Sequence, residues 1–295
     1  MLSGWEEMDS NRVAGWLVAL VALGCSGGGM PNSPNYAPTT DAGPTGPFDI
    51  TIASSPPIDL PGTVLWLDAD FGVAREGTQV RAWTDRSGHG HVVERQAISN
   101  DPGPSADRLA GHGALRFDGH ARMVLSETIE DQAREALTIA DQDFLIALVL
   151  RQDVPTSSTF FALAPREPSD SSAMALLSLQ PALELVLASG GARTVIETTA
   201  TPAGPHLVVV LSQGPRLIVR LDGQEVGMRP FGRLEGEKMD GTVLALPFLI
   251  PFVGAWDLDL PGLSGLIGDV VVVAGDGVAA ATAPLEDYLK KKYGL

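Results

Sequence analysis

The chain has 295 residues, of which 44% are hydrophobic and 19% charged, so there is enough apolar material for a sizeable core. Acidic side chains outnumber basic ones by 36 to 20. The net charge of −16 argues against nucleic acid or an anionic lipid surface as the main partner, because the protein's field would repel either one. The single cysteine excludes a disulfide within the chain. The length fits one large domain or two small ones.

Residues 1–24 predict an export signal. An apolar run extends from Val13 to Gly24, which is shorter than the about 20 residues that a membrane-spanning helix needs. Arg12 precedes it, as expected of a short basic segment before such a run. Acidic residues further upstream are unusual in a signal peptide, and a start at Met8 instead of Met1 would remove most of them.

The only cysteine, Cys25, directly follows this run in the stretch VALGCSGGG, which resembles a bacterial lipobox. The resemblance implies cleavage before Cys25, a diacylglyceryl group on its sulfur, and membrane contact through this anchor. Ala22 and Leu23 depart from the commonest pattern, which has leucine and then a small residue. A signal peptide with an incidental cysteine, or a buried thiol, is the alternative. Ser26 would favour the outer membrane or cell surface of a bacterial envelope.

Residues 25–61 predict a tether, because Pro, Gly, Ser and Thr dominate them and an apolar period is absent before Phe48. Such a segment cannot bury enough surface to offset the entropy of ordering. No repeat and no second linker divides residues 62–295, so we expect one domain there.

Short apolar runs bounded by turn residues predict that this domain is mostly β-strand. They are rich in β-branched residues and read VLWLDA, FLIALVL, LELVLA, LVVVL, LIVRL and DVVVVAG. The segment from His206 to Val226 predicts three strands, with turns at residues 213–215 and at Asp222-Gly223.

The segment TAPLEDYLKKKYGL, which begins at Thr282, predicts a C-terminal helix. Pro284 would occupy its first turn, lysines 290–292 would complement the negative end of its dipole, and Gly294 would end it. An apolar stripe would dock on the sheets; it consists of Leu285, Tyr288 and Leu289.

Five motifs in order carry a family resemblance. The opening PGTVLWLDAD is followed by a W-x-D-x-S-G-x-G turn, a G-x-x-F-D-G strand end, the middle hairpin, and a closing strand before a helix that ends in K-Y-G. The turn and strand-end residues are Trp83, Asp85, Ser87, Gly88, Gly90, Phe117, Asp118 and Gly119. This order resembles the concanavalin A-like lectin/glucanase superfamily in its laminin-G-like branch, which usually has glutamate at the position of Asp269. The resemblance implies an all-β, two-sheet antiparallel jelly-roll sandwich with a short C-terminal helix.

The physical roles of these motif residues are mainly structural. Asp85 can accept hydrogen bonds from backbone amides two residues on, and Gly88 and Gly90 permit a positive φ. Trp83 and Phe117 fit core positions better than ligand platforms.

No catalytic residue is assigned. Laminarinase-type members of the superfamily carry E-x-D-x-x-E on one strand, where alternation places the carboxylates on one face. That spacing does not occur here, and Glu127 and Glu130 lack the intervening aspartate. Carboxylates that are far apart in the sequence and meet only in the folded protein form no such motif, so a hydrolase or lyase remains an alternative.

Two metal sites are conceivable. Carboxylate and backbone oxygens are the ligands of Ca²⁺, which is common in laminin-G-like domains; the D-x-D pairs near expected strand ends are Asp68, Asp70, Asp257 and Asp259. His89 and His91 would share one strand face and could bind zinc with Asp107 or Asp118. The alternatives are solvated turn aspartates and a histidine-bearing surface loop.

Sugar binding usually needs an exposed aromatic face. The best candidate is Trp256 beside Asp257 and Asp259 in a loop bounded by Gly and Pro, although it could equally cover the core. An aromatic content of 6% is low for a dedicated polysaccharide binder. We therefore predict a binding module that contacts a glycan or an envelope protein. A polysaccharide hydrolase or lyase and a purely structural envelope protein are the alternatives.

Overall fold

The chain divides by backbone contacts into residues 1–47 and 48–295. The computed structural model describes residues 58–96, 103–125, 142–154, 158–164, 173–177, 182–189, 192–200, 203–230, 250–254 and 262–295. None of the helices among these residues is long and apolar enough to span a membrane. Four of the candidate site residues lie outside the described ranges, namely Cys25, Trp256, Asp257 and Asp259, and so does the acidic pair Glu127 and Glu130.

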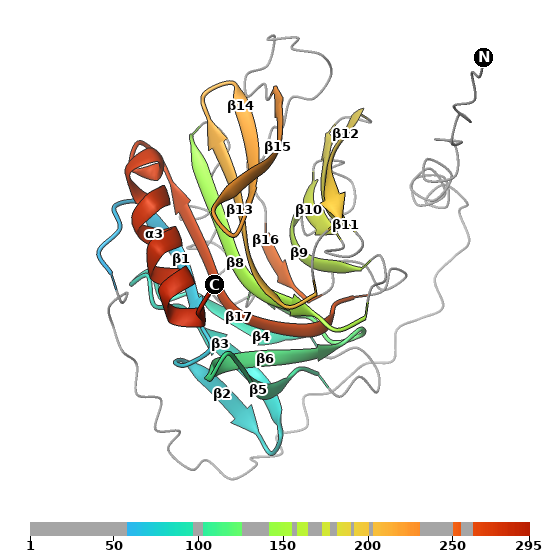
Figure 1. Cartoon of the computed structure of the whole chain (residues 1–295). Helices are drawn as coiled ribbons and strands as arrows, with labels where there is room; N and C mark the ends of the chain where they lie inside the picture. The colour runs from blue at the N-terminus through green and yellow to red at the C-terminus, as the bar shows by residue number, and fades with distance from the viewer. Residues whose placement is uncertain are drawn as a thin grey trace, which may run out of the picture. The chain divides into compact units, whose positions relative to one another are not determined.

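The first sheet is built around three long strands, with β8 between β13 and β17 (Figure 1). One edge of β17 pairs with β8, and the sheet continues through β13 and β14 to β15. The other edge of β17 is shared by β6 and β1. All these pairings are antiparallel. The strands are β1 (Thr63–Asp68), β6 (His112–Asp118), β8 (Phe144–Gln152), β13 (Pro205–Gln213), β14 (Arg216–Leu221), β15 (Gln224–Pro230) and β17 (Ser264–Ala274).

The second sheet is made of shorter antiparallel strands and follows the order β2, β3, β4, β7, β16, β9, β10, β11, β12. Strand β5 pairs with β6 and, through one residue pair, with β3, so it links the two sheets. The strands are β2 (Val73–Glu76), β3 (Gln79–Thr84), β4 (Val92–Arg95), β5 (Ser105–Leu109), β7 (Met123–Leu125), β9 (Thr159–Ala164), β10 (Ala173–Leu177), β11 (Ala182–Ser189), β12 (Ala192–Ala200) and β16 (Ile250–Val253). The predicted antiparallel sandwich is confirmed.

The core has two layers, because both faces of the first sheet are covered. On β8, Ile146 and Leu148 pack into the core between the sheets, whereas Leu145 and Ala147 pack on the opposite face beneath the helix. Successive side chains of a strand point to opposite faces, so burial of both faces demands an unbroken apolar run. This explains why FLIALVL and DVVVVAG lack polar alternation.

Helix α3 (Val278–Tyr293) begins before the predicted start at Thr282, so the expected position of Pro284 in the first turn was wrong. The alanine-rich stretch before Pro284 is a strong helix former, and it extends the helix upstream of the proline ring. Pro284 therefore lies inside the helix, where its missing N–H removes one backbone bond.

The remaining features of α3 agree with prediction. Leu285 and Leu289 are buried against the first sheet, with Tyr288 packed beside them. Gly294 has the left-handed conformation, with a φ of 69°, and its N–H donates to the Lys290 carbonyl. The glycine cap and the apolar stripe thus place the last helical turn over the end of β1 and the middle of β17 (Figure 1).

The predicted hairpin from His206 onward is confirmed as β13, β14 and β15. Asp222 and Gly223 both have positive φ, at 52° and 85°, as a tight hairpin turn requires. The Asp222 carboxylate also contacts His206 Nδ1 at 2.7 Å and accepts the Leu207 N–H at 2.8 Å. The aspartate of this turn therefore ties the start of β13 to the end of β14.

Candidate functional site

Two aspartates face each other in the first sheet, where the end of β1 pairs with the middle of β17. Asp68 ends β1, and in the antiparallel register it lies opposite Asp269 of β17. The two side chains expose 1% and 0% of their surface. Because two buried carboxylates repel each other and lose hydration, this arrangement requires positive charge and hydrogen-bond donors nearby.

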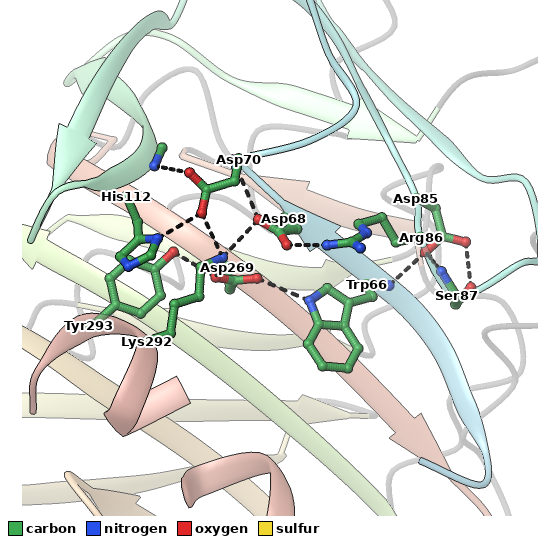
Figure 2. Close-up of polar contacts among 11 residues, drawn as sticks. Trp66, Asp68, Asp70, Asp85, Arg86, Ser87, His112, Asp269, Lys292 and Tyr293 are labelled. Carbon is green, nitrogen blue, oxygen red and sulfur yellow. Dashed lines mark hydrogen bonds and ion pairs between the residues drawn. The ribbon is translucent and has the colours of Figure 1, made fainter. Parts of the chain in front are cut away.

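The last turn of α3 supplies both requirements (Figure 2). Lys292 Nζ lies 2.8 Å from Asp68 Oδ1 and 2.8 Å from Asp269 Oδ2, and the lysine side chain is itself only 6% exposed. Tyr293 Oη donates to Asp269 Oδ2 at 2.6 Å, and Trp66 Nε1 donates to Asp269 Oδ1 at 3.0 Å. These five residues, Trp66, Asp68, Asp269, Lys292 and Tyr293, form what we call the lysine cluster.

The electrostatics of the lysine cluster favour a charged lysine. Burial alone would lower the pKa of Lys292, but the charges and hydrogen bonds of Asp269 and Asp68 outweigh it and raise that pKa well above its ordinary value. Burial raises the pKa of Asp269, and the negative charge of Asp68 adds to this effect. Burial also raises the pKa of Tyr293, so its hydroxyl stays a hydrogen-bond donor. The cluster therefore binds the helix end to both strands.

The tryptophan-containing turn is attached to the same cluster. Arg86 Nη1 donates to Asp68 Oδ2, whereas Lys292 binds the other oxygen of this carboxylate, Oδ1. The neighbouring Asp85 accepts the backbone N–H of Trp66 at 2.6 Å and of Ser87 at 2.8 Å through its Oδ1 atom. The turn thus replaces a neighbouring strand along this edge of β1.

The other motif residues support this frame. Trp83 and Phe117 are 0% and 1% exposed and belong to the core between the sheets. Asp118 Oδ1 accepts the backbone N–H groups of His120 and Ala121, both at 3.1 Å. These contacts match the structural roles that the sequence favours for them.

A partly exposed rim surrounds the lysine cluster on one side. Asp70 Oδ1 accepts the Gly113 N–H at 2.6 Å, and its Oδ2 lies 2.9 Å from His112 Nδ1 and 3.3 Å from Lys292 Nζ. The side chains of Asp70 and His112 are 29% and 40% exposed. Partial burial would raise the pKa of Asp70, but the Gly113 and His112 hydrogen bonds and the charge of Lys292 outweigh it and lower that pKa. Phe71 follows Asp70 in the chain, and its exposed ring packs against the Arg86 guanidinium.

The structure brings the first predicted calcium pair together but places it beside cations of the chain itself. Asp68 binds Lys292 and Arg86, and Asp70 contacts His112. Within the described ranges, no group of three or more His, Cys, Asp or Glu side chains is arranged to hold a metal ion. The second pair, Asp257 and Asp259, lies outside these ranges, and the calcium site stays a prediction.

The predicted zinc pair lies at the end of the tryptophan-containing turn. The rings of His89 and His91 stack with centroids 5.8 Å apart and planes 18° apart. His91 is fully buried, and among the residues that the structure describes neither of its ring nitrogens has a hydrogen-bond partner. Burial lowers the pKa of His91, which favours the neutral, metal-binding form. Asp107, the proposed third ligand, instead binds Arg116 at 2.6 Å, and the zinc site stays a prediction.

Sequence reasoning missed the partner of the two aspartates. It treated lysines 290–292 as charges that complement the helix dipole. The signal was present in the spacing, because Leu285, Leu289 and Lys292 stand at i, i+4 and i+7 and so share one helix face. A lysine on the buried stripe of a helix requires an anionic partner beneath it.

No family model matches the sequence, and no curated protein matches it. Among solved structures, the chain is similar to domain 4 of AbnA, a GH43 extracellular arabinanase from Geobacillus stearothermophilus, in complex with arabinotriose. The TM-score is 0.52 at 13% identity, and the match covers 77% of this chain and 100% of that domain. It is also similar to the binding domain of botulinum neurotoxin serotype D, with a TM-score of 0.51 at 10% identity, covering 77% of this chain and 51% of that one. These likenesses show the β-sandwich fold.

Proposed function

We propose that this chain is an exported, lipid-anchored binding module whose β-sandwich binds carbohydrate. The observation that carries the proposal is the structural likeness to domain 4 of the arabinanase, which this chain matches over that domain's whole length and which was solved with arabinotriose. The concanavalin A-like motif order supports the same class of ligand. A protein of the envelope is the alternative partner.

The carboxylates of the lysine cluster have a structural role and not a catalytic one. A general acid or nucleophile must reach the substrate, whereas Asp68 and Asp269 are almost completely buried. Both are also bound to Lys292, which holds them as structural anions. Trp256, flanked by Asp257 and Asp259, remains our sequence-based candidate for a stacking residue, and Ca²⁺ remains a candidate cofactor there.

Carbohydrate binding is tested on the full chain, purified in a mild detergent, against a panel of neutral oligosaccharides that includes arabinotriose. We expect saturable binding to at least one member, because a preformed sandwich presents side chains without a large ordering cost. Calorimetry measures it, and the heat-denatured chain is the control. A folded chain that binds no member of the panel would contradict the proposal.

Lipid anchoring is tested separately by Cys25→Ser. The unaltered chain should enter the membrane fraction and incorporate labelled palmitate, because acylation at one cysteine adds more than the single chain that anchors only marginally. The variant should incorporate no label. If the variant stays in the membrane fraction and the unaltered chain takes up no palmitate, the anchor does not exist.

A further inference from the structure

We propose that Phe71 and His112, held by Asp70 and Arg86, form a contact surface for a neutral sugar at the end of β1. This inference rests on the proposed function and locates it on the molecule. These four residues, which we call the β1 rim, come from the turn after β1, from the tryptophan-containing turn and from the start of β6.

Phe71 is the part of the β1 rim that could stack on a sugar. Of the residues that the structure describes, three large apolar ones are exposed, and Phe71, at 42%, is the aromatic one among them. The Arg86 guanidinium carbon lies 4.0 Å from the ring centroid, so a cation covers one face of the ring. The rest of the ring is available to the C–H surface of a sugar, which packs on aromatic faces.

His112, at the start of β6, supplies a directed polar group to the β1 rim through its contact with Asp70. Its Nδ1 atom is 2.9 Å from Asp70 Oδ2, an arrangement in which Nδ1 carries the proton and donates to the carboxylate. In the tautomer in which Nδ1 donates to Asp70, Nε2 is the ring atom that can accept a hydrogen bond from a sugar hydroxyl. The ring is further positioned by Tyr293, whose ring centroid lies 5.5 Å away at an interplanar angle of 65°.

Three residues of the β1 rim, Asp70, Arg86 and His112, are held in place by polar contacts with one another or with the lysine cluster (Figure 2). Arg86 is fixed by the buried Asp68, and Asp70 is fixed by the Gly113 N–H and by Lys292. Side chains that are already held in one conformation lose little entropy when a ligand binds. An exposed aromatic ring and an imidazole that are both held in fixed positions can bind a ligand on an open surface, without a pocket around it.

Charge selects a neutral sugar over an anionic one. The lowered pKa of Asp70 keeps this carboxylate ionised at neutral pH, and the chain carries a net charge of −16. An acidic sugar would be repelled by both, whereas hydroxyl groups can donate to a carboxylate without penalty.

The test compares variants of the full chain for binding to the tightest oligosaccharide of the panel. We expect Phe71→Ala to weaken binding about tenfold and His112→Ala about fivefold, as the loss of one stacking contact and of one hydrogen bond predict. Phe71→Trp should retain binding, which separates loss of the ring from loss of the fold. Met228→Ala is the matched control, because Met228 is a similarly exposed apolar residue on β15, at 41%.

The outcomes distinguish this inference from the function on which it rests. If the unaltered chain binds a sugar and Phe71→Ala and His112→Ala bind as tightly as Met228→Ala, the β1 rim is not the site, although the proposed function stands. If the unaltered chain binds no sugar, the proposed function fails and the inference fails with it. Preferential binding of acidic oligosaccharides would also overturn the assignment of a neutral sugar.

Discussion

Replacement of Lys292 by methionine should lower the free energy of unfolding by about 3–5 kcal/mol, because it leaves buried carboxylates without their counter-ion. Methionine matches the lysine stem in length, so the change removes charge and hydrogen bonds with little change in packed volume. Asp68 keeps its bond to Arg86, whereas Asp269 keeps only neutral donors, Trp66 and Tyr293. Urea denaturation of the full chain, followed by tryptophan fluorescence, measures the loss.

The control for this experiment lies one residue away. Lys291 is exposed on the same helical turn, and Lys291→Met should change the free energy of unfolding by less than about 0.5 kcal/mol. Adding Asp269→Asn to Lys292→Met should recover part of the loss, since it removes the carboxylate that is left with neutral donors alone. Equal losses in the Lys291 and Lys292 variants would mean that the buried ion pairs contribute nothing specific.

Replacement of Asp85 by alanine should have the second-largest effect, a loss of about 2–4 kcal/mol. The substitution leaves the backbone N–H groups of Trp66 and Ser87 without their acceptor, and Trp66 lies in a buried strand. A buried donor that loses its partner costs its full desolvation penalty. Thermal unfolding monitored by circular dichroism measures the change as a lower midpoint.

Asp118→Ala is the matched control for Asp85→Ala. Asp118 also accepts two backbone N–H groups, but it is exposed, so water can replace the carboxylate. We expect a loss below about 1 kcal/mol for this variant. If the two alanine variants lose the same stability, burial of the Trp66 amide is not what makes Asp85 important.

Much of the fold could be predicted because it depends on local patterns. Strand β13 and its two partners follow from apolar runs and from Asp222-Gly223, a pair suited to positive φ. The docking face of α3 follows from the spacing of Leu285 and Leu289. The start of α3 could not be predicted in the same way. Pro284 is a strong signal for a first helical turn, and the packing of Val278 against the first sheet is not apparent from the sequence alone.

The lysine cluster could not be predicted as a whole because it depends on register between distant segments. Asp68 and Lys292 are 224 residues apart, and they meet only if β1 and β17 pair with Asp68 opposite Asp269. A shift of β1 by one residue against β17 would turn Asp68 to the other face of the sheet, away from Asp269. Asp68 therefore looked like a solvated turn residue or a calcium ligand, although it is a buried partner of two cations.

The position of Lys292 in the chain has a consequence for the order of assembly. The first strand of the described domain, β1, pairs with its last strand, β17, and the ion pair that joins them is contributed by Lys292 in the final turn of α3. Such long-range contacts form late, since most of the chain must be ordered before its ends can meet. Until Lys292 has been synthesised, β1 has neither its neighbouring strand β17 nor its counter-ion. The edge of the first sheet at β1 thus stays open until β17 and α3 have folded onto it.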